Sequence, residues 1–298
     1  DARGEPVPPR TWAQLRADAS KLTIYNVPGK RSSGIRRLGF APNFGNSWLY
    51  LYAWEAGGSL LSADGTRVTM DSPPVVRALR FMTDIYDDLG GVRAVNAFQA
   101  GLAGESSGGS FRSNASGADL DPFLSGQVAM KIDNDYALRM IADWKPEMDF
   151  RIAPAPMPAD QLAKGRAPVT WAGGFSLVIP STSRNKDGAF KLIQFITSWQ
   201  GTKFLAQGNR ERQESEGKIY LPEGLANRVY FDRLVKDAIY DNPRVPATFK
   251  KAYRVLADLM PHTLYRPVTP VGQVLWNQHV RAYEAGVSHK LAADAKRA

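Results

Sequence analysis

The sequence contains no cysteine and no apolar run close to the roughly 18–20 residues that span a bilayer. The first absence excludes disulfides, thiolate nucleophiles and cysteine-based metal sites, and it leaves the redox compartment open. The second predicts that the chain has no transmembrane helix. With 298 residues, of which 44% are hydrophobic, the chain is long enough to form one or two globular domains.

Catalytic and cofactor motifs are also missing. The three histidines, His262, His279 and His289, have no metal-ligand spacing. There is no nucleophile elbow, no phosphate-binding P-loop and no dinucleotide-binding glycine motif. We therefore predict no metal and no cofactor, and we interpret the histidines as surface or packing residues.

Charge is the next constraint, because 38 Lys and Arg against 29 Asp and Glu give a formal net charge of +9. A nucleic-acid module would interleave basic residues with aromatics on one element, and this pattern is absent. We predict no nucleic-acid partner. We interpret the basic residues as solvated surface, with an anionic partner, ligand or lipid surface as the alternative.

Hydrophobic periodicity and turn residues predict an α/β protein. The predicted helices are 10–23, 45–58 with Asn46 or Ser47 as cap, 72–90, 137–144, two within 183–209, and most of 224–298. The predicted strands are 36–42, 128–132, 149–158 (which runs into a proline-rich connector) and 169–183, and the predicted loops are 26–37 and 101–118.

Polar side chains follow the predicted strand 128–132, as Asp133, Asn134, Asp135 and Tyr136. Sugars present C–H faces that pack on aromatic rings, and hydroxyls that pair with Asp and Asn. The same combination occurs at 46–48, where a helix N-terminus adds free N–H donors. The two stretches have what a carbohydrate site needs, but each alone is more typical of a structural role, with Trp48 as a core residue. Asp133 and Asp135 could also be the carboxylate pair of a glycosidase.

The order of several segments resembles one family. The segments are PPRTWAQLRADASKLT, GNSWLYLYAWEAGGSLLSADG, FLSGQVAMKIDNDYA, WAGGFSLVIPSTSRNKDGAFKLIQFITSWQGTKFLAQ and YRPVTPV. Together they resemble the extracytoplasmic solute-binding proteins of ABC importers, over residues 6–275. The resemblance is closest to the carbohydrate group that includes maltose- and glycerol-3-phosphate-binding proteins.

This resemblance implies a periplasmic-binding-protein-like fold of two α/β lobes joined by hinge strands. It assigns 8–155 and 222–298 to the second lobe, and 156–221 to the hinge and the returning part of the first. The family's chains begin with much of the first lobe, whereas this sequence begins at Asp1, just before the crossing into the second. We therefore expect a processed or truncated chain.

The same resemblance implies a function without turnover. A sugar, an oligosaccharide or a phosphorylated polyol would bind in an interlobe cleft and pass to the permease subunits of an ABC transporter. The expected protein is monomeric, extracytoplasmic and not an enzyme. The alternatives are a glycoside-acting enzyme that uses Asp133 and Asp135, and a basic module for an anionic partner.

Site residues follow from the resemblance position by position. Tyr136 takes the place of a sugar-stacking ring, with Asn134 and Asp135 beside it. The remaining expected ligand contacts are Asn46 and Trp48 at a helix start, Trp171, Gly173 and Gly174 on a strand near the hinge, and Arg266 in a loop.

Overall fold

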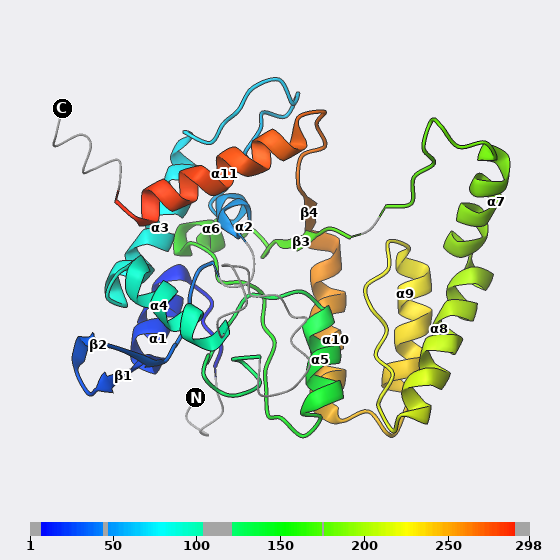
Figure 1. Ribbon diagram of the computed structural model, residues 1–298, viewed down its shortest axis with the longest axis horizontal. Coiled ribbons are helices and arrows are strands. Elements are labelled where there is room, and N and C mark those ends of the chain that lie inside the picture. The colour runs from blue at the N-terminus through cyan, green and yellow to red at the C-terminus, as the bar shows by residue number, and fades with distance from the viewer. Residues whose placement is uncertain (1–6, 44–46, 104–120, 175, 290–298) are drawn as a thin grey trace. The chain divides into compact units, whose positions relative to one another are not determined.

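The computed structural model describes residues 7–43, 47–103, 121–174 and 176–289. Its contacts divide the chain into two units, shown together in Figure 1. The first unit contains residues 1–133, 153–172 and 259–298, and the second contains 134–152 and 173–258. The lobe boundaries given above stay a prediction.

The first unit holds most of the described core. Its elements are α1 (Trp12–Leu22), β1 (Ile24–Val27), β2 (Lys30–Arg37), α2 (Leu49–Glu55), α3 (Pro73–Asp88), α4 (Val92–Ala103), α6 (Ala159–Ala163), β3 (Thr170–Ala172), a 3-10 turn (Met260–His262), β4 (Thr263–Tyr265) and α11 (Gly272–Val287). β1 and β2 are antiparallel, whereas β3 and β4 are parallel.

Helix α1 begins where the sequence predicts. The Thr11 hydroxyl accepts a hydrogen bond from the backbone N–H of Gln14, and Oε1 of Gln14 accepts one from the Thr11 N–H. This capping box satisfies two backbone donors that a helix start leaves open. The buried face of α1 includes Trp12 and Leu15, which fix the helix to the core.

Helix α2 is buried on every side, since all of its residues from Leu49 to Glu55 are buried. An all-round apolar helix belongs in the middle of a core rather than on its surface. Trp48 occupies the N-cap position without a side-chain cap, so the predicted cap by Ser47 is wrong. Asn46 lies outside the described residues.

Helix α3 confirms its prediction, because Ser72 precedes it and Pro73 and Pro74 occupy its first turn. Its ring Phe81 stacks on Trp12 of α1, with centroids 4.2 Å apart and planes 8° from parallel. At the other end, the Tyr283 hydroxyl of α11 donates to the Tyr86 hydroxyl over 2.7 Å. These contacts join α1, α3 and α11 around α2.

The predicted loop 26–37 is wrong, because these residues form most of the hairpin of β1 and β2. Tyr25 lies opposite Ile35, and Val27 opposite Lys30, with irregular register between them. Gly29 closes the turn with φ of 74°, a conformation that glycine adopts without strain. The hairpin is polar and mostly exposed, so it lacks the alternation by which strands are found in sequences.

Of the four predicted strands, three are shorter than expected, and 149–158 forms no strand, with only a single bridge between Met157 and Thr11. β2 ends at Arg37, and Leu38 forms a single bridge with Val128. Residues 128–132 therefore extend beside 38–39 through backbone hydrogen bonds without forming a strand. Of 169–183, only Thr170–Ala172 forms a ladder, in which Trp171 lies opposite Leu264.

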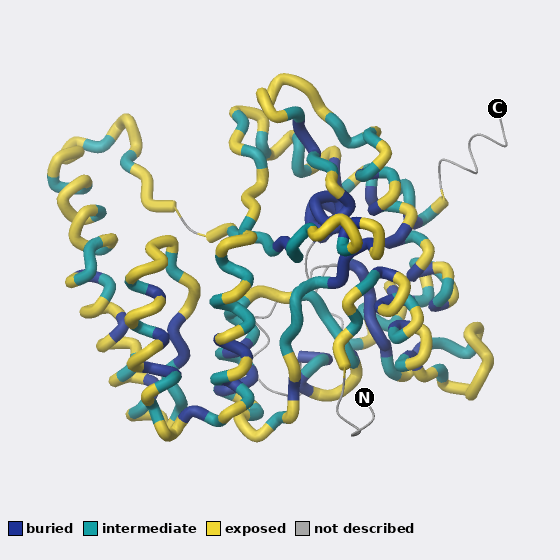
Figure 2. The backbone as a smooth tube through the Cα atoms, turned by 180° about the vertical axis from the view of Figure 1, so that it is seen from behind, coloured by how far each residue is buried: buried dark blue, intermediate teal, exposed yellow. Residues whose placement is uncertain are grey.

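The described part of the second unit is helical. It contains α5 (Tyr136–Trp144), α7 (Lys186–Thr197), α8 (Trp199–Ser215), α9 (Arg228–Val235), a π-helical turn (Lys236–Tyr240) and nearly all of α10 (Ala247–Leu259). Phe150 and Phe249 pack edge to face at 5.2 Å. Helix α7 has no buried residue, and yellow dominates this region in Figure 2. The helices predicted in 183–209 and 224–298 are confirmed.

The predicted loop 101–118 falls mostly outside the described residues, and its first three positions belong to α4. Across the described ranges, every helix is too short or too polar to cross a membrane.

Glu55 offers a test of the core, because burial raises the pKa of its carboxyl well above the ordinary 4.5. Trp12 Nε1 donates a hydrogen bond to Oε2 of Glu55 over 3.0 Å, which lowers the pKa but offsets only part of the rise. Above pH 4.5 the unfolded chain releases a proton that the folded chain keeps. The free energy of unfolding should therefore fall as pH rises, by about 1.4 kcal/mol per pH unit up to the folded pKa.

We expect Glu55→Gln to remove this decline, because the amide cannot ionise but can still accept from Trp12. Urea denaturation between pH 4.5 and 8 would show the variant gaining stability over the wild type as pH rises. Glu147→Gln, on the surface, is the matched control. Parallel curves for Glu55→Gln and the wild type would contradict a protonated buried Glu55.

Candidate functional site

An aromatic cluster lies in the first unit and joins three segments that are distant in the sequence. We call Trp48, Tyr50, Trp171, Trp276 and His279 the tryptophan cluster. Trp48 meets Trp171 edge to face at 6.0 Å. Tyr50 lies 6.0–6.3 Å from Trp48, Trp171, Trp276 and His279. Tyr50 is therefore the centre of the cluster.

Secondary structure brings these rings together. Trp48 and Tyr50 stand at the start of α2, which is fixed by its burial. Trp171 is the middle residue of β3 and pairs with Leu264 of β4. Trp276 and His279 are three residues apart on α11 and so share one helix face. Their rings are 4.7 Å apart.

Arg266 follows β4 directly and covers the cluster. Its guanidinium carbon lies 4.8 Å from the centroid of Trp276 and 5.6 Å from that of Trp171. Such cation–π contacts contribute about 0.5–1 kcal/mol each at exposed sites. An aromatic ring offers the guanidinium no oxygen or nitrogen acceptor, so these contacts leave its N–H donors available.

Trp171 and Trp276 are both partly exposed, in contrast to Trp48 and Tyr50, which are 3% and 1% exposed. Within the described part of the chain, the Nε1–H of Trp171 has no hydrogen-bond acceptor. That nitrogen is itself buried, so the outer half of the cluster offers partly exposed ring surface and the guanidinium of Arg266, while the inner half supports it.

His279 connects the cluster to the chain before α2. Its Nδ1 is 3.2 Å from the Trp276 carbonyl, and its Nε2 is 2.9 Å from the Ser47 hydroxyl. A carbonyl only accepts, so Nδ1 carries the proton and neutral Nε2 accepts from Ser47. Burial lowers the pKa of His279, and the nearby charge of Arg266 lowers it further.

The lowered pKa of His279 predicts that its contact with Ser47 is sensitive to acid. Below the ordinary pKa of 6.5 the unfolded chain binds a proton that folded His279 does not, so the free energy of unfolding should fall as pH decreases from 6.5. We expect His279→Gln to weaken this dependence, measured by denaturation between pH 5 and 8. His262→Gln, at an exposed position, is the control. An imidazole NMR titration of His279 at or above pH 6.5 would contradict the neutral state.

The structure places three of the predicted ligand contacts, Trp48, Trp171 and Arg266, in this one cluster. Trp48 is core and supports Trp171 from behind rather than presenting a face to solvent. Sequence reasoning missed Tyr50, Trp276 and His279. The three-residue spacing of the last two within a helical segment is the signal that could have identified them.

The predicted contacts Asn134, Asp135 and Tyr136 belong to the second unit. They precede or begin α5 rather than end a strand, and Tyr136 is partly exposed. Asp135 accepts a hydrogen bond from the Gly224 N–H over 2.7 Å, which holds the segment before α9. Gly173 and Gly174 are exposed residues where the chain leaves the first unit. That these residues share a site with Trp48 stays a prediction.

The carboxylate pair proposed for glycoside hydrolysis has structural partners instead. Asp133 forms an ion pair with Lys131 over 2.7 Å, and the same Lys131 lies 3.1 Å from Asp121. Asp135 holds Gly224, as described above. A catalytic pair needs two carboxyls whose surroundings shift their pKa values apart, so that one acts as acid and the other as base or nucleophile. The contacts of Asp133 and Asp135 instead indicate structural roles in place of catalysis.

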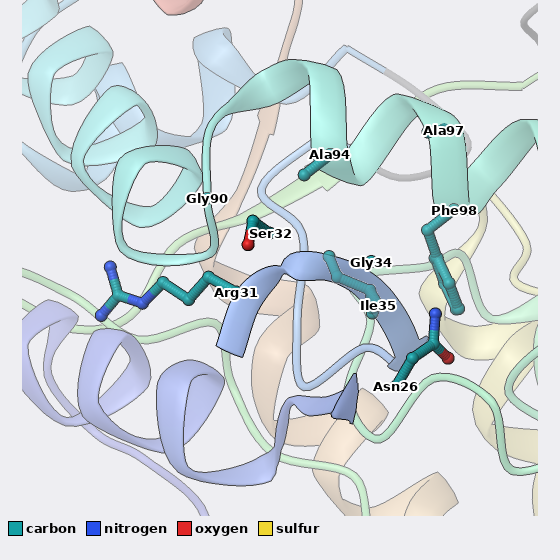
Figure 3. A pocket seen from close by; sticks show the side chains of 9 residues that line it. All are labelled: Asn26, Arg31, Ser32, Gly34, Ile35, Gly90, Ala94, Ala97 and Phe98. Atoms are coloured by element: carbon teal, nitrogen blue, oxygen red, sulfur yellow. The ribbon is translucent and has the colours of Figure 1, made fainter. Parts of the chain in front are cut away.

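A hollow of the first unit, away from the tryptophan cluster, lies between the hairpin and α4. Its volume is about 610 Å³, and Figure 3 shows Asn26 and Phe98 at one end and Arg31 at the other. The remaining lining is mainly glycine, alanine and serine. The Asn26 amide already donates to the Ser33 carbonyl over 2.8 Å. The hollow therefore has fewer groups for ligand recognition than the tryptophan cluster.

Metal binding finds no support in the described ranges, where no three His, Asp or Glu side chains gather closely enough to hold an ion.

Comparison with solved structures gives the fold. The fold matches CpMnBP1 with mannobiose bound, with a TM-score of 0.63, 21% identity, and coverage of 95% of this chain and 61% of that one. It also matches the maltotriose-bound MalE domain of Bdellovibrio bacteriovorus, with a TM-score of 0.57, 21% identity, and coverage of 99% and 66%. The chain thus has the periplasmic-binding-protein-like α/β fold, and it spans about 60–67% of such chains.

Sequence comparison then gives the family. Residues 1–209 match the bacterial extracellular solute-binding proteins, and the chain belongs to this family, which is not a family of enzymes. A Brucella abortus (strain 2308) protein, provisionally named a binding protein, is 24% identical over 234 residues, or 78% of this chain and 50% of its own length. The chain spans about half the length of the curated relatives it matches.

Proposed function

We propose that the chain is the sugar-binding component of an ABC importer, acting outside the cytoplasm and delivering its ligand to membrane permease subunits. The family and the fold support this role. Among the similar structures are a Thermotoga lettingae solute-binding protein of an ABC transporter with tagatose bound and a Listeria monocytogenes ABC substrate-binding protein with cycloalternan bound. The ligand is held without turnover, and the protein acts as a monomer.

The tryptophan cluster is the observation that carries the proposal for this chain. Two partly exposed indoles, Trp171 and Trp276, lie beside the donors of Arg266. Aromatic faces bind the C–H faces of a sugar ring, while a guanidinium donates to ring or hydroxyl oxygens. The buried rings Trp48 and Tyr50 hold the outer indoles in place, so the binding surface is formed before ligand arrives.

Asn134, Asp135 and Tyr136 of the second unit are further proposed ligand contacts, with Gly173, Gly174 and Asn46 as backbone or amide partners. Tyr136 offers a partly exposed ring, and Asn134 is an exposed amide beside it. This is the combination of stacking and hydroxyl pairing that a carbohydrate needs.

Sugar binding by the 298-residue chain is the direct test. Isothermal titration against a panel of mono- and disaccharides is expected to identify at least one ligand, and Trp171→Ala is expected to weaken it by about 1–3 kcal/mol, as for ring stacking elsewhere. Trp171→Phe should retain most of the affinity because it keeps a flat ring. Trp144→Ala, an exposed indole of α5, is the matched control.

Failure of every sugar to bind would overturn the proposal. If Trp171→Ala bound the sugar with the same affinity as the wild type, the tryptophan cluster would not be the sugar-binding surface.

Tyr136 is tested separately because it belongs to the other unit. Tyr136→Ala is expected to lower the affinity for the same ligand by about 1–3 kcal/mol, whereas Tyr136→Phe should preserve stacking. Thermal unfolding of both variants shows whether α5 still forms. Unchanged affinity in a folded Tyr136→Ala variant would exclude this ring from ligand contact.

A further inference from the structure

The hydrogen-bonding groups at the exposed side of the tryptophan cluster are donors. Arg266 contributes its guanidinium N–H groups. The Nε1–H of Trp171 also lacks an acceptor within the described ranges, but it is buried, so the guanidinium is the donor at the exposed side. His279 donates a hydrogen bond from Nδ1–H to the Trp276 carbonyl, and its Nε2 is already paired with the Ser47 hydroxyl. The cluster contains no carboxylate.

A neutral sugar presents hydroxyls, each of which both donates and accepts, and carboxylates are the usual partners for their protons. An exposed guanidinium without a carboxylate beside it fits an acceptor-rich group better. Carboxylate and phosphate oxygens accept several hydrogen bonds and pair bidentately with a guanidinium.

The position of Arg266 supports this reading. Many other arginines are neutralised by carboxylates, among them Arg16, Arg77, Arg139 and Arg210. Arg266 has no carboxylate within 4.0 Å among the residues that the structure describes. Two indoles instead hold it at 4.8 and 5.6 Å, which orients the guanidinium without consuming its charge.

The surroundings keep that charge in place. His279, which lies behind Trp276, stays neutral because burial and the nearby Arg266 lower its pKa. The whole chain carries a net charge of +9, so its long-range field also favours anions.

We infer that the ligand of this site is an acidic sugar, and that Arg266, positioned by Trp171 and Trp276, binds its carboxylate or phosphate group. The inference rests on the proposed function and adds a charge to the ligand. It separates this chain from similar structures whose bound ligands are mannobiose and maltotriose, both neutral. Arg266 is then a specificity residue that selects the acid over its neutral parent.

The test compares neutral and acidic forms of one sugar by isothermal titration of the 298-residue chain. The probes are glucose, glucuronate and glucose 6-phosphate, followed by galactose and galacturonate, with acetate and inorganic phosphate alone as anion controls. At least one acidic sugar should bind 10-fold or more tightly than its neutral parent. The carboxylate and phosphate arms show which oxyanion is recognised.

Arg266→Gln should abolish this preference, so that the acidic sugar loses at least 10-fold more affinity than its neutral parent. Arg233→Gln is the matched control, because Arg233 stacks on Trp199 at 5.2 Å in the other unit and its removal changes the net charge equally. The preference should survive in Arg233→Gln. Thermal unfolding of both variants shows that each is folded.

Three results would overturn the inference while leaving sugar binding intact. The neutral sugar could bind as tightly as its acid, the preference could persist in Arg266→Gln, or Arg266→Gln could bind the neutral sugar more tightly because Arg266 covers the stacking faces. Inorganic phosphate or acetate binding as tightly as the acidic sugar would overturn it too, since the sugar would then add nothing. Failure of all sugars, neutral and acidic, would instead overturn the proposed function.

Discussion

Burial of α2 is the constraint on which the first unit depends. A helix whose residues from Leu49 to Glu55 are all buried needs neighbours on every side. Trp12 and Phe81 form one of these neighbours as a stacked pair, and Trp12 also donates a hydrogen bond to the buried carboxyl of Glu55. Because the surrounding elements pack on one central helix, their positions relative to each other are fixed within this unit.

The candidate site is a consequence of that packing. Tyr50 points from α2 toward rings on β3 and α11, and each of those rings is partly supported by it. The parallel pairing of β3 with β4 then sets Arg266 one residue beyond the strand, over Trp171 and Trp276. A binding surface supported by a rigid core loses little conformational entropy on binding a ligand. The same core keeps His279 neutral behind that surface.

Local signals in the sequence predicted the helices well. The capping box at Thr11 and the prolines after Ser72 act through backbone hydrogen bonds and φ angles within one turn, so they work wherever the helix lies. The strands were predicted poorly. The β1–β2 hairpin is exposed and polar, and the segment at Val128 pairs through only a few backbone contacts with Leu38, so neither shows the alternation that marks a strand.

For the site, the sequence alone determined which residue types were available. Its resemblance to a family, which the comparisons then confirmed, predicted ligand contacts at Trp48, Trp171 and Arg266. Only the tertiary structure decided that these three meet, that Trp48 is a buried support, and that Trp276 and His279 join them. The physical reason is distance along the chain. Capping and periodicity act within a few residues, whereas rings more than 200 residues apart, such as Tyr50 and Trp276, come together only when the core around α2 has formed.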